Sequence, residues 1–164
     1  MDYQLTEVAP GFLFGTRVRN DSAVYINSYT LNIASNSFKY VSFYNKIFET
    51  TTVADTNRHT VYKNKNIIYL DNNKIFTATK SDFTAEYSLN LLACCHLGTH
   101  GYLPSKAKLY SFAIYDNNTL IKKFMPCYRV ADGEIGLLDI INNEFYTNNG
   151  TGEFLKGNNI NQGT

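Results

Sequence analysis

Acidic residues are the first groups in this sequence that could do catalytic chemistry. Carboxylates spaced E-x-D-x-E or E-x-D-x-x-E along a strand share one face and can flank a glycosidic bond. That spacing does not occur here, and the nearest approach, Asp132 with Glu134, lacks the third acid. The other candidates stand alone along the chain, namely Glu49, Glu86 and Glu144. We therefore expect no enzymatic activity, unless two carboxylates about 5–9 Å apart meet across strands in a cleft.

The run Cys94-Cys95-His96 is the second group with reactive side chains. Neighbouring residues of a strand point to opposite faces, so the two thiols cannot bind one metal ion without distortion. The chain has no Cys-x-x-Cys to complete a site, and it lacks the Gly-rich and H-E-x-x-H motifs of nucleotide and zinc-protease sites. We expect Cys94 and Cys95 to be small buried residues. With three cysteines in the chain, pairing of Cys127 with either of them stays open.

The segment 96–107, HLGTHGYLPSKA, has the composition of a binding loop. Sugar recognition needs a flat aromatic face for the C–H side of a ring, together with polar groups for its hydroxyls. Tyr102 could supply the aromatic face. The candidate polar groups are Asn20, Asp21, Thr99 and His100. Asp21 and a backbone carbonyl could also hold a calcium ion, an alternative that rests on a single carboxylate. Apart from that option, we expect no metal and no cofactor.

Strands must position these groups, because the composition is that of an all-β domain. The 164 residues contain 13 Tyr, 11 Phe and no Trp, together with 20 Asn, which form five Asn-Asn doublets. Aromatic residues suit a pleated, half-buried sheet, and Asn tolerates the left-handed backbone of tight hairpin turns. No window has a sustained 3.6-residue apolar period of helical length.

Charge and hydropathy exclude several classes of partner. Fifteen Lys and Arg against fourteen Asp and Glu give a net charge of +1, so no field favours nucleic acid or an anionic membrane. No apolar run approaches the roughly 18 residues that span a bilayer. The first ten residues have neither the basic patch nor the apolar stretch of a signal peptide. We expect a soluble protein that neither binds nucleic acid nor inserts into a membrane.

Apolar and aromatic runs recur at short intervals with turn residues between them. They predict strands near 2–6, 11–19, 23–33, 38–45, 59–63, 66–71, 74–79, 87–96, 106–116, 119–128, 135–140 and 144–147. Tight turns are expected at Asn64-Lys65, Asn72-Asn73 and Asn117-Asn118, joining neighbouring strands into an antiparallel meander. On this strand count, the connections at 20–22, 46–58 and 96–107 emerge at one end of the domain, where recognition loops usually lie. We predict one domain over 1–157 and a flexible tail over 158–164.

The C-terminal third, residues 108–157, reads KLYSFAIYDNNTLIKKFMPCYRVADGEIGLLDIINNEFYTNNGTGEFLKG. It closely resembles a pattern common in tail-associated proteins of phages and prophages of gut Firmicutes and in some bacterial surface proteins. Those proteins carry laminin-G-like, concanavalin A-like jelly-roll domains. FLFGTR at 12–17 and RHTVYKNKNIIYLDN at 58–72 also look like interior strands of this family. The resemblance implies an antiparallel two-sheet jelly-roll sandwich.

The resemblance carries further expectations. Such domains usually open with an extra strand before the segment that matches residues 1–6, so we expect the family's first strand to be missing. The expected function is a non-catalytic, lectin-like module that binds cell-surface carbohydrate or protein. It would belong to a phage tail fibre, a receptor-binding protein or a bacterial adhesin, on the virion tail or the extracellular surface. The alternative is a structural virion or fibre component whose surface serves oligomerisation, so a homo-oligomer stays open.

Overall fold

The computed structural model describes residues 1–9, 11–17, 28–32, 37–43, 46–49, 52, 54–65, 67–77, 87–150 and 152–157. Within these ranges the chain forms strands, turns and bends with no helix, so the all-β prediction is confirmed for the described residues. It follows that no helix in these ranges is long and apolar enough to cross a membrane. Asn20, Asp21 and the predicted tail at 158–164 lie outside the described residues.

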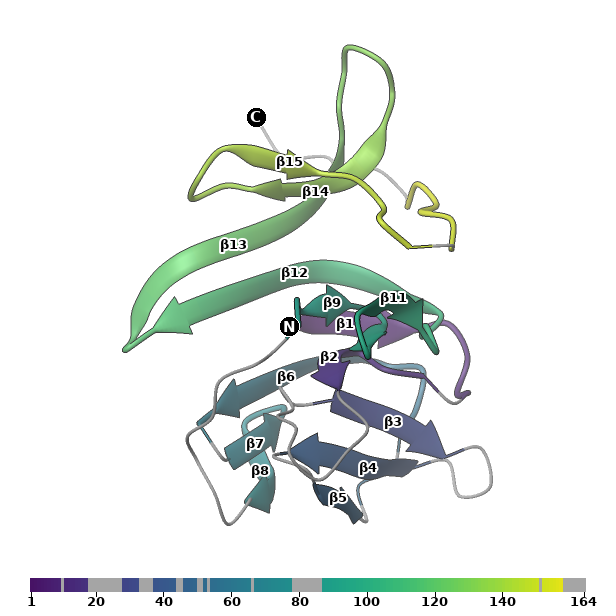
Figure 1. The fold of residues 1–164 in the computed structure, drawn as a ribbon, viewed down its shortest axis with the longest axis vertical. Helices are drawn as coiled ribbons and strands as arrows, with labels where there is room; N and C mark the ends of the chain where they lie inside the picture. The colour runs from purple at the N-terminus through teal and green to yellow at the C-terminus, as the bar shows by residue number, and fades with distance from the viewer. Residues whose placement is uncertain are drawn as a thin grey trace.

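The strands form three sheets (Figure 1). The largest is antiparallel with eight strands in the order β15-β14-β13-β12-β1-β6-β7-β8; the others have the orders β11-β10-β2-β9 and β3-β4-β5. In the second sheet β2 and β10 run parallel. The strands are β1 (Asp2–Leu5), β2 (Phe14–Arg17), β3 (Ser28–Asn32), β4 (Ser37–Phe43), β5 (Lys46–Glu49), β6 (Arg58–Asn64), β7 (Ile67–Leu70), β8 (Asn73–Thr77), β9 (Asn90–Leu91), β10 (Cys94–His96), β11 (Thr99–Tyr102), β12 (Ala107–Asp116), β13 (Thr119–Tyr128), β14 (Ile135–Asp139) and β15 (Glu144–Tyr146).

Left-handed residues close the hairpins of the large sheet. Asn117 and Asn118 have φ of 45° and 68° and join β12 to β13, as predicted. The turn between β7 and β8 is Asp71-Asn72, with φ of 48° and 65°, which lies one residue before the predicted pair. Positive φ at both central residues gives a turn whose twist matches that of the paired strands, so Asn and Asp are favoured there.

Two predicted loops contain strands. Residues 46–49 form β5 within the stretch 46–58, and residues 99–102 form β11 within the stretch 96–107. The predicted strand 87–96 is divided into β9 and β10, because Leu92 has a φ of 55° that an extended strand cannot keep. Strand β1 lies inside the sheet and pairs with β12 on one side and β6 on the other, so it is not an open edge.

The hydrophobic core lies between the middle of the large sheet and β2. The large sheet contributes side chains from both its central strands and the adjoining hairpins, while Leu13 and Phe14 come from the β2 segment. The buried core residues are Tyr3, Leu5, Leu13, Phe14, Ala54, Val61, Ile68, Leu70, Phe112 and Phe124. Two β layers therefore share one core.

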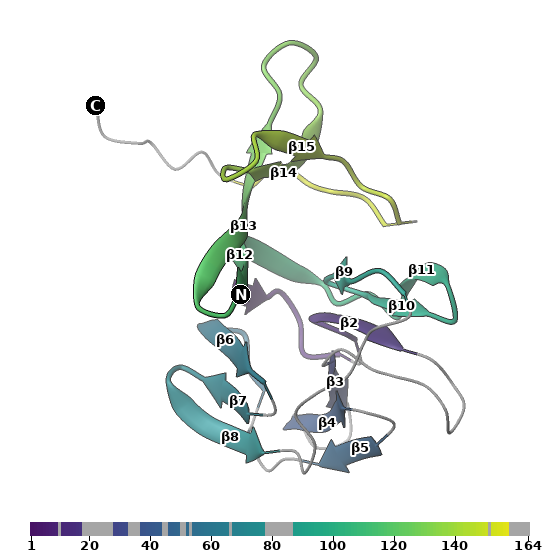
Figure 2. The ribbon, with the colours of Figure 1, turned by 60° about the vertical axis from the view of Figure 1, so that its left-hand side comes forward.

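Strands β13, β14 and β15 with the segment after them form an arm (residues 119–157) that extends from the body (residues 1–116) in Figures 1 and 2. The segment after β15 returns to the body, where a Cβ built on Gly150 would lie 3.8 Å from the Cα of Gly101. The ladder between β12 and β13 runs from Asp116 opposite Thr119 to Phe112 opposite Phe124 and ends there. Beyond this point β13 pairs with β14, whereas β12 pairs with β1.

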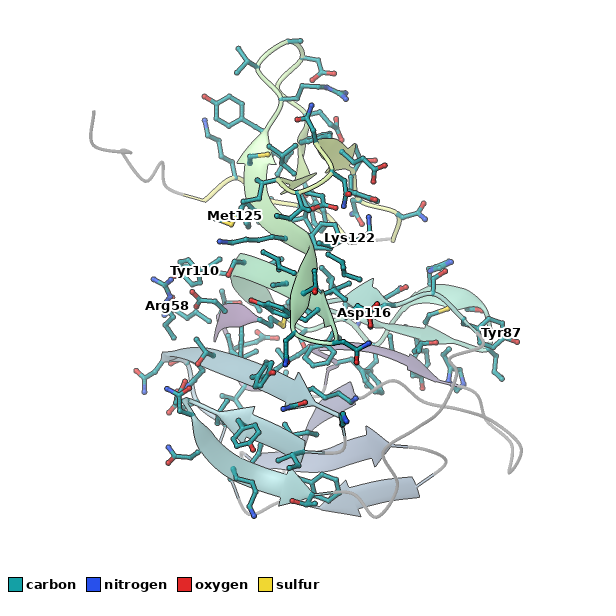
Figure 3. All side chains as sticks on the ribbon, turned by 90° about the vertical axis from the view of Figure 1, so that its left-hand side faces the viewer. Arg58, Tyr87, Tyr110, Asp116, Lys122 and Met125 are labelled. Carbon is teal, nitrogen blue, oxygen red and sulfur yellow. The ribbon has the colours of Figure 1, made fainter. Side chains whose placement is uncertain are left out.

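A bulge explains why β12 and β13 part. Asp2 lies opposite Ser111, but Tyr3 lies opposite Leu109, so Tyr110 is an extra residue on β12. A bulge bends the strand that carries it. The Tyr110 hydroxyl donates to the Gln4 side chain at 2.9 Å, and the Arg58 guanidinium lies 3.9 Å from the Tyr110 ring centroid. Figure 3 shows Arg58 and Tyr110 together at the edge of the body, below the arm that carries Lys122 and Met125.

Gly136 allows β14 and β15 to approach each other closely. A Cβ at this position would lie 2.3 Å from the Tyr146 carbonyl oxygen and 2.7 Å from the Phe145 ring. We predict that Gly136→Ala destabilises the protein by roughly 1–3 kcal/mol, because a backbone atom must move. Chemical denaturation measures the change. The control is Gly152→Ala, whose added Cβ meets nothing within 4 Å; equal effects of the two substitutions would contradict the predicted clash.

Candidate functional site

The hairpin of β10 and β11 holds the sequence-predicted site residues that the structure describes. Its turn is Leu97-Gly98, with φ of 51° and 80°, and it joins strands that are two residues apart. Cys94 lies opposite Tyr102 and His96 lies opposite Thr99, so β11 has one residue more than β10 between these pairs. The extra residue forms a bulge at His100-Gly101, where Gly101 supplies a φ of 73°.

The bulge places Tyr102 over His96. Opposed residues of a ladder share a face, so Thr99 and Tyr102 both lie on the face of β10 that carries His96. The Tyr102 and His96 rings stack, with centroids 4.6 Å apart and an interplanar angle of 25°. Phe12, which is buried, lies beside Tyr102 at 6.3 Å. Tyr102 itself is 43% exposed, so the ring is supported from one side and open to solvent on another.

His100 is oriented by a contact outside the hairpin. Its Nδ1 lies 2.9 Å from the Asn90 Oδ1 on β9, and because an amide oxygen only accepts, Nδ1 is the donor in this bond. The other ring nitrogen, Nε2, is then the one that can accept a hydrogen bond from a ligand hydroxyl. The structure therefore brings Thr99, His100 and Tyr102 together on one short hairpin. The predicted partners Asn20 and Asp21 lie outside the described residues.

The hairpin is tied to the body by backbone bonds at its two ends. Leu92 donates its N–H to the Leu13 carbonyl at 2.7 Å, and the Leu92 carbonyl accepts from Ser105 at 2.8 Å. The Leu103 carbonyl accepts from Phe12 at 3.0 Å. Leu92, Leu97 and Leu103 have φ between 47° and 55°, which costs about 1–3 kcal/mol for a side chain of this kind. Strain of this kind gathers around the segment that presents Tyr102.

The arm has a shallow cleft that sequence reasoning missed. It has a volume of about 420 Å³ and is lined by Asp132, Gly133, Glu134, Ile135, Asn148, Gly152, Glu153 and Phe154. Asp132 bonds Arg129, with the Arg129 Nη2 2.5 Å from Asp132 Oδ2, so this acid is neutralised beside the cleft. The signal in the sequence was the clustering of acids and glycines in 132–153, which reads equally well as turn chemistry.

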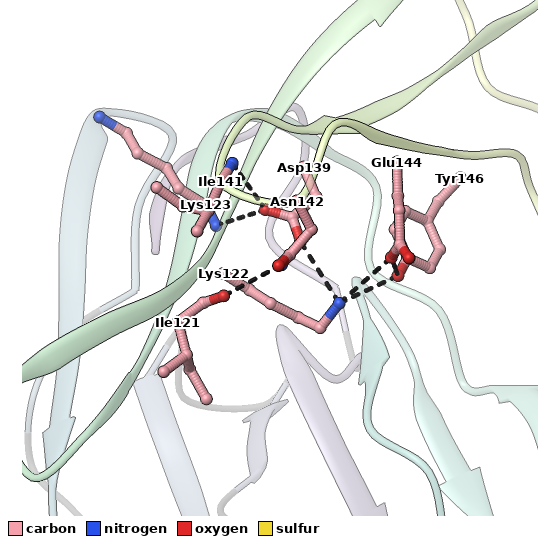
Figure 4. Close-up of polar contacts among 8 residues, drawn as sticks. All are labelled: Ile121, Lys122, Lys123, Asp139, Ile141, Asn142, Glu144 and Tyr146. Carbon is pink, nitrogen blue, oxygen red and sulfur yellow. Dashed lines mark hydrogen bonds and ion pairs between the residues drawn. The ribbon is translucent and has the colours of Figure 1, made fainter.

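Asp139 organises the arm (Figure 4). Its Oδ1 accepts the Lys123 N–H at 3.0 Å and the Ile141 N–H at 3.2 Å, and its Oδ2 accepts the Asn142 amide at 2.6 Å and Lys122 Nζ at 3.3 Å. Burial alone would raise the pKa of Asp139, but these four donors together lower it well below its usual range. This wholly buried carboxylate fastens β13 to the turn between β14 and β15.

Lys122 extends the same network to solvent. Its Nζ lies 3.0 Å from the Tyr146 hydroxyl and 3.5 Å from Glu144 Oε2. The bond with Tyr146 is the main reason that the pKa of Lys122 is raised above its ordinary value. The Tyr146 hydroxyl in turn donates to Glu144 at 2.5 Å. Every charged group of this cluster is occupied by another, so we assign the cluster to architecture. Arg129 pairs with Asp132, and Asp139 pairs with Lys122.

Two carboxylates from different segments meet around His59. His59 Nδ1 lies 2.5 Å from Asp71 Oδ2, and His59 Nε2 lies 2.9 Å from Asp55 Oδ1. Burial would lower the pKa of His59, but the two carboxylates raise it overall. The hydrogen bond with His59 is the main cause of the lowered pKa of Asp55. Burial would raise the pKa of Asp71, but hydrogen bonds from His59 and from the Thr60 N–H outweigh it and lower the pKa. A glycosidase needs one carboxyl group with a raised pKa, and this pair has none.

The prediction that Cys94 and Cys95 are small buried residues is confirmed. Cys94 and Cys95 are buried, and all three cysteines are free thiols. Burial raises the pKa of Cys95, which makes it a poor nucleophile. Over the described ranges, no group of three or more His, Cys, Asp or Glu residues could hold a metal ion.

Comparisons of the chain with models of protein families, with curated proteins and with solved structures found no match.

The strained turn of the β10–β11 hairpin gives a stability prediction. Leu97→Asn should raise the free energy of unfolding by roughly 1 kcal/mol, because Asn tolerates a φ of 51° far better than Leu. Gly98→Ala at the next position should have the opposite effect and destabilise the protein. Its φ is 80°, and a Cβ there would lie 3.3 Å from the Tyr87 ring. Urea titrations of both variants test the assignment, and a destabilised Leu97→Asn protein would count against it.

The Asp55–His59–Asp71 cluster predicts a pH dependence of stability. A raised pKa of His59 stabilises the fold fully below the unfolded value near 6.5, and this stabilisation is lost as the pH rises through the folded pKa. Because both carboxylates are about half exposed, we expect the loss to be about 1 kcal/mol or less.

Unfolding free energies of the wild type at pH 5.5 and pH 8.5 measure this loss, and His59→Gln is the control in which it should disappear. The lowered pKa values of Asp55 and Asp71 add a second, acid-side loss as the pH falls through their folded values. A wild type that gains stability between pH 5.5 and pH 8.5 would refute the arrangement.

Proposed function

We propose that this chain is a non-catalytic recognition module that binds carbohydrate on a cell surface through the β10–β11 hairpin. The observation that supports the proposal is the Tyr102 ring, which is 43% exposed and stacked at 4.6 Å on His96. A supported ring loses little side-chain entropy when a ligand covers it. Its open side is suited to the C–H face of a sugar ring.

Polar groups of the hairpin would orient the bound sugar on the Tyr102 ring. Thr99 shares the Tyr102 face and can donate or accept through its hydroxyl. His100, held at Nδ1 by Asn90, would receive a sugar hydroxyl at Nε2. Leu97 and Leu103, in and just after the same hairpin, are exposed and would suit the apolar edge of a glycan or of a protein ligand. Protein on a cell surface is therefore the second ligand class that the hairpin fits.

The finer fold and the biological setting belong to the same proposal. The large antiparallel sheet and the core shared with β2 are compatible with a laminin-G-like jelly roll. The resemblance of residues 108–157 to tail proteins of phages and prophages supports a place in a tail fibre, a receptor-binding protein or a bacterial adhesin. On this proposal the domain acts on the virion tail or outside the cell. It needs neither a cofactor nor a catalytic group.

Binding to a panel of bacterial cell-wall polysaccharides and glycans tests the proposal. Tyr102→Ala should weaken binding about fivefold to thirtyfold, the loss expected for an aromatic stacking contact of about 1–2 kcal/mol. His100→Ala should have a smaller effect. The matched control is Tyr115→Ala, which removes a tyrosine on β12 that is 54% exposed, against 43% for Tyr102. Absence of binding by the wild type to glycans and to host surface proteins, or equal losses for Tyr102 and Tyr115, would overturn it.

A further inference from the structure

The segment after β15 brings the arm into contact with the β10–β11 hairpin. In Figures 1 and 2 this segment runs from β15 toward β11. With 3.8 Å between a Cβ built on Gly150 and the Cα of Gly101, the two backbones meet without a side chain between them. Gly101 has a φ of 73° and stands between His100 and Tyr102 in the bulge of the hairpin. The arm therefore touches the hairpin between its two main candidate ligand-binding side chains.

This contact places the cleft of the arm next to the hairpin. Consecutive Cα atoms are about 3.8 Å apart, so the Cα atoms of Tyr102 and Gly150 are at most about 9 Å apart. Asn148 and Gly152, each two residues from Gly150, both line the cleft. The cleft therefore begins within two residues of the contact, and a ligand longer than one sugar ring can reach from Tyr102 to it.

The cleft offers both kinds of group that a sugar ring needs. Its volume of about 420 Å³ is within the range of small-molecule sites, roughly 300–1,000 Å³. Phe154 gives it a half-buried aromatic wall for the C–H face of a ring. Glu134 and Glu153 are exposed, and within the described ranges no hydrogen bond or ion pair occupies their carboxylates. Each carboxylate can accept from two neighbouring hydroxyls of a sugar.

Two asparagines hold the backbone on either side of the contact. The half-buried Asn148 accepts the Gly150 N–H at Oδ1 over 2.9 Å and donates its amide to the Gly152 carbonyl. On the hairpin, Asn90 holds His100 at 2.9 Å. A ligand that spans the contact therefore meets two segments that are already ordered, which lowers the entropic cost of binding.

We propose that the cleft of the arm is a second subsite of the glycan site, and that the ligand is an uncharged oligosaccharide with one ring on Tyr102 and the next rings in the cleft. This inference rests on the proposed function and narrows its ligand class to glycans of more than one sugar ring. The carboxylates of Glu134 and Glu153 repel phosphate and uronic acid groups, because like charges brought together at an interface are costly. Polyanionic wall polymers are therefore the disfavoured ligands.

The dependence of affinity on glycan length tests the proposal. The probes are uncharged oligomers of glucose, galactose, rhamnose and N-acetylglucosamine, each from one to six rings, titrated into the full chain. For the oligomers that bind, affinity should rise about fivefold to thirtyfold with length, as expected for a second aromatic contact. Phe154→Ala and Glu153→Ala should remove most of this gain and leave single-ring affinity unchanged. Tyr102→Ala should weaken binding at every length. The matched control is Leu155→Ala, which removes a neighbouring side chain that does not line the cleft.

Three results would overturn the second subsite alone. They are equal affinity of the wild type for one ring and for longer oligomers, a gain with length that Phe154→Ala and Glu153→Ala both retain, and tighter binding of a phosphate-containing wall polymer than of every neutral oligomer. In each case the hairpin still binds sugar, so the proposed function stands. Failure of the wild type to bind any glycan would instead overturn the proposed glycan site and the second subsite together.

Discussion

The long strand β12 is the constraint on which the rest of the structure depends. Its first half is bonded to β1 and shares the core of the body, and its second half is bonded to β13 and supports the arm. The bulge at Tyr110 divides the two roles, because a strand that has gained one residue cannot keep both neighbours in register. The divergence of β12 and β13, and with it the position of the arm, follows from this one extra residue.

The arm shows how a small sheet is held without a core of its own. Among its described residues only Phe124, Gly136 and Asp139 are buried. In place of hydrophobic packing, four donors converge on the Asp139 carboxylate. Because the carboxylate is shielded from solvent, each of these hydrogen bonds is stronger than it would be in water. The proposed recognition hairpin is built differently: its rings stack, and its ends are held by backbone bonds from strained leucines.

Sequence reasoning reached the all-β class, most strand positions and the Asn117-Asn118 turn, because period-two patterns and turn residues are local signals. It missed β11, since Gly98, Gly101 and Pro104 are typical of loops, and only the pairing with β10 makes an extended strand there favourable. It identified Tyr102 but not its support by His96, which depends on a bulge in the pairing. It did not identify Lys122 as the partner of Asp139, because the residue that reaches this carboxylate is chosen by the register of β13 on β14.

Because Cys94 and Cys95 are both buried, their reactivity toward a thiol reagent reports local opening of the structure around β10. Both thiols lie on β10, one strand of the β10–β11 hairpin, and neither reaches solvent while β10 stays paired with β2 and β11. Cys127 on the arm is only partly covered. The rates at which a thiol reagent modifies these positions would separate motion of the hairpin from motion of the arm.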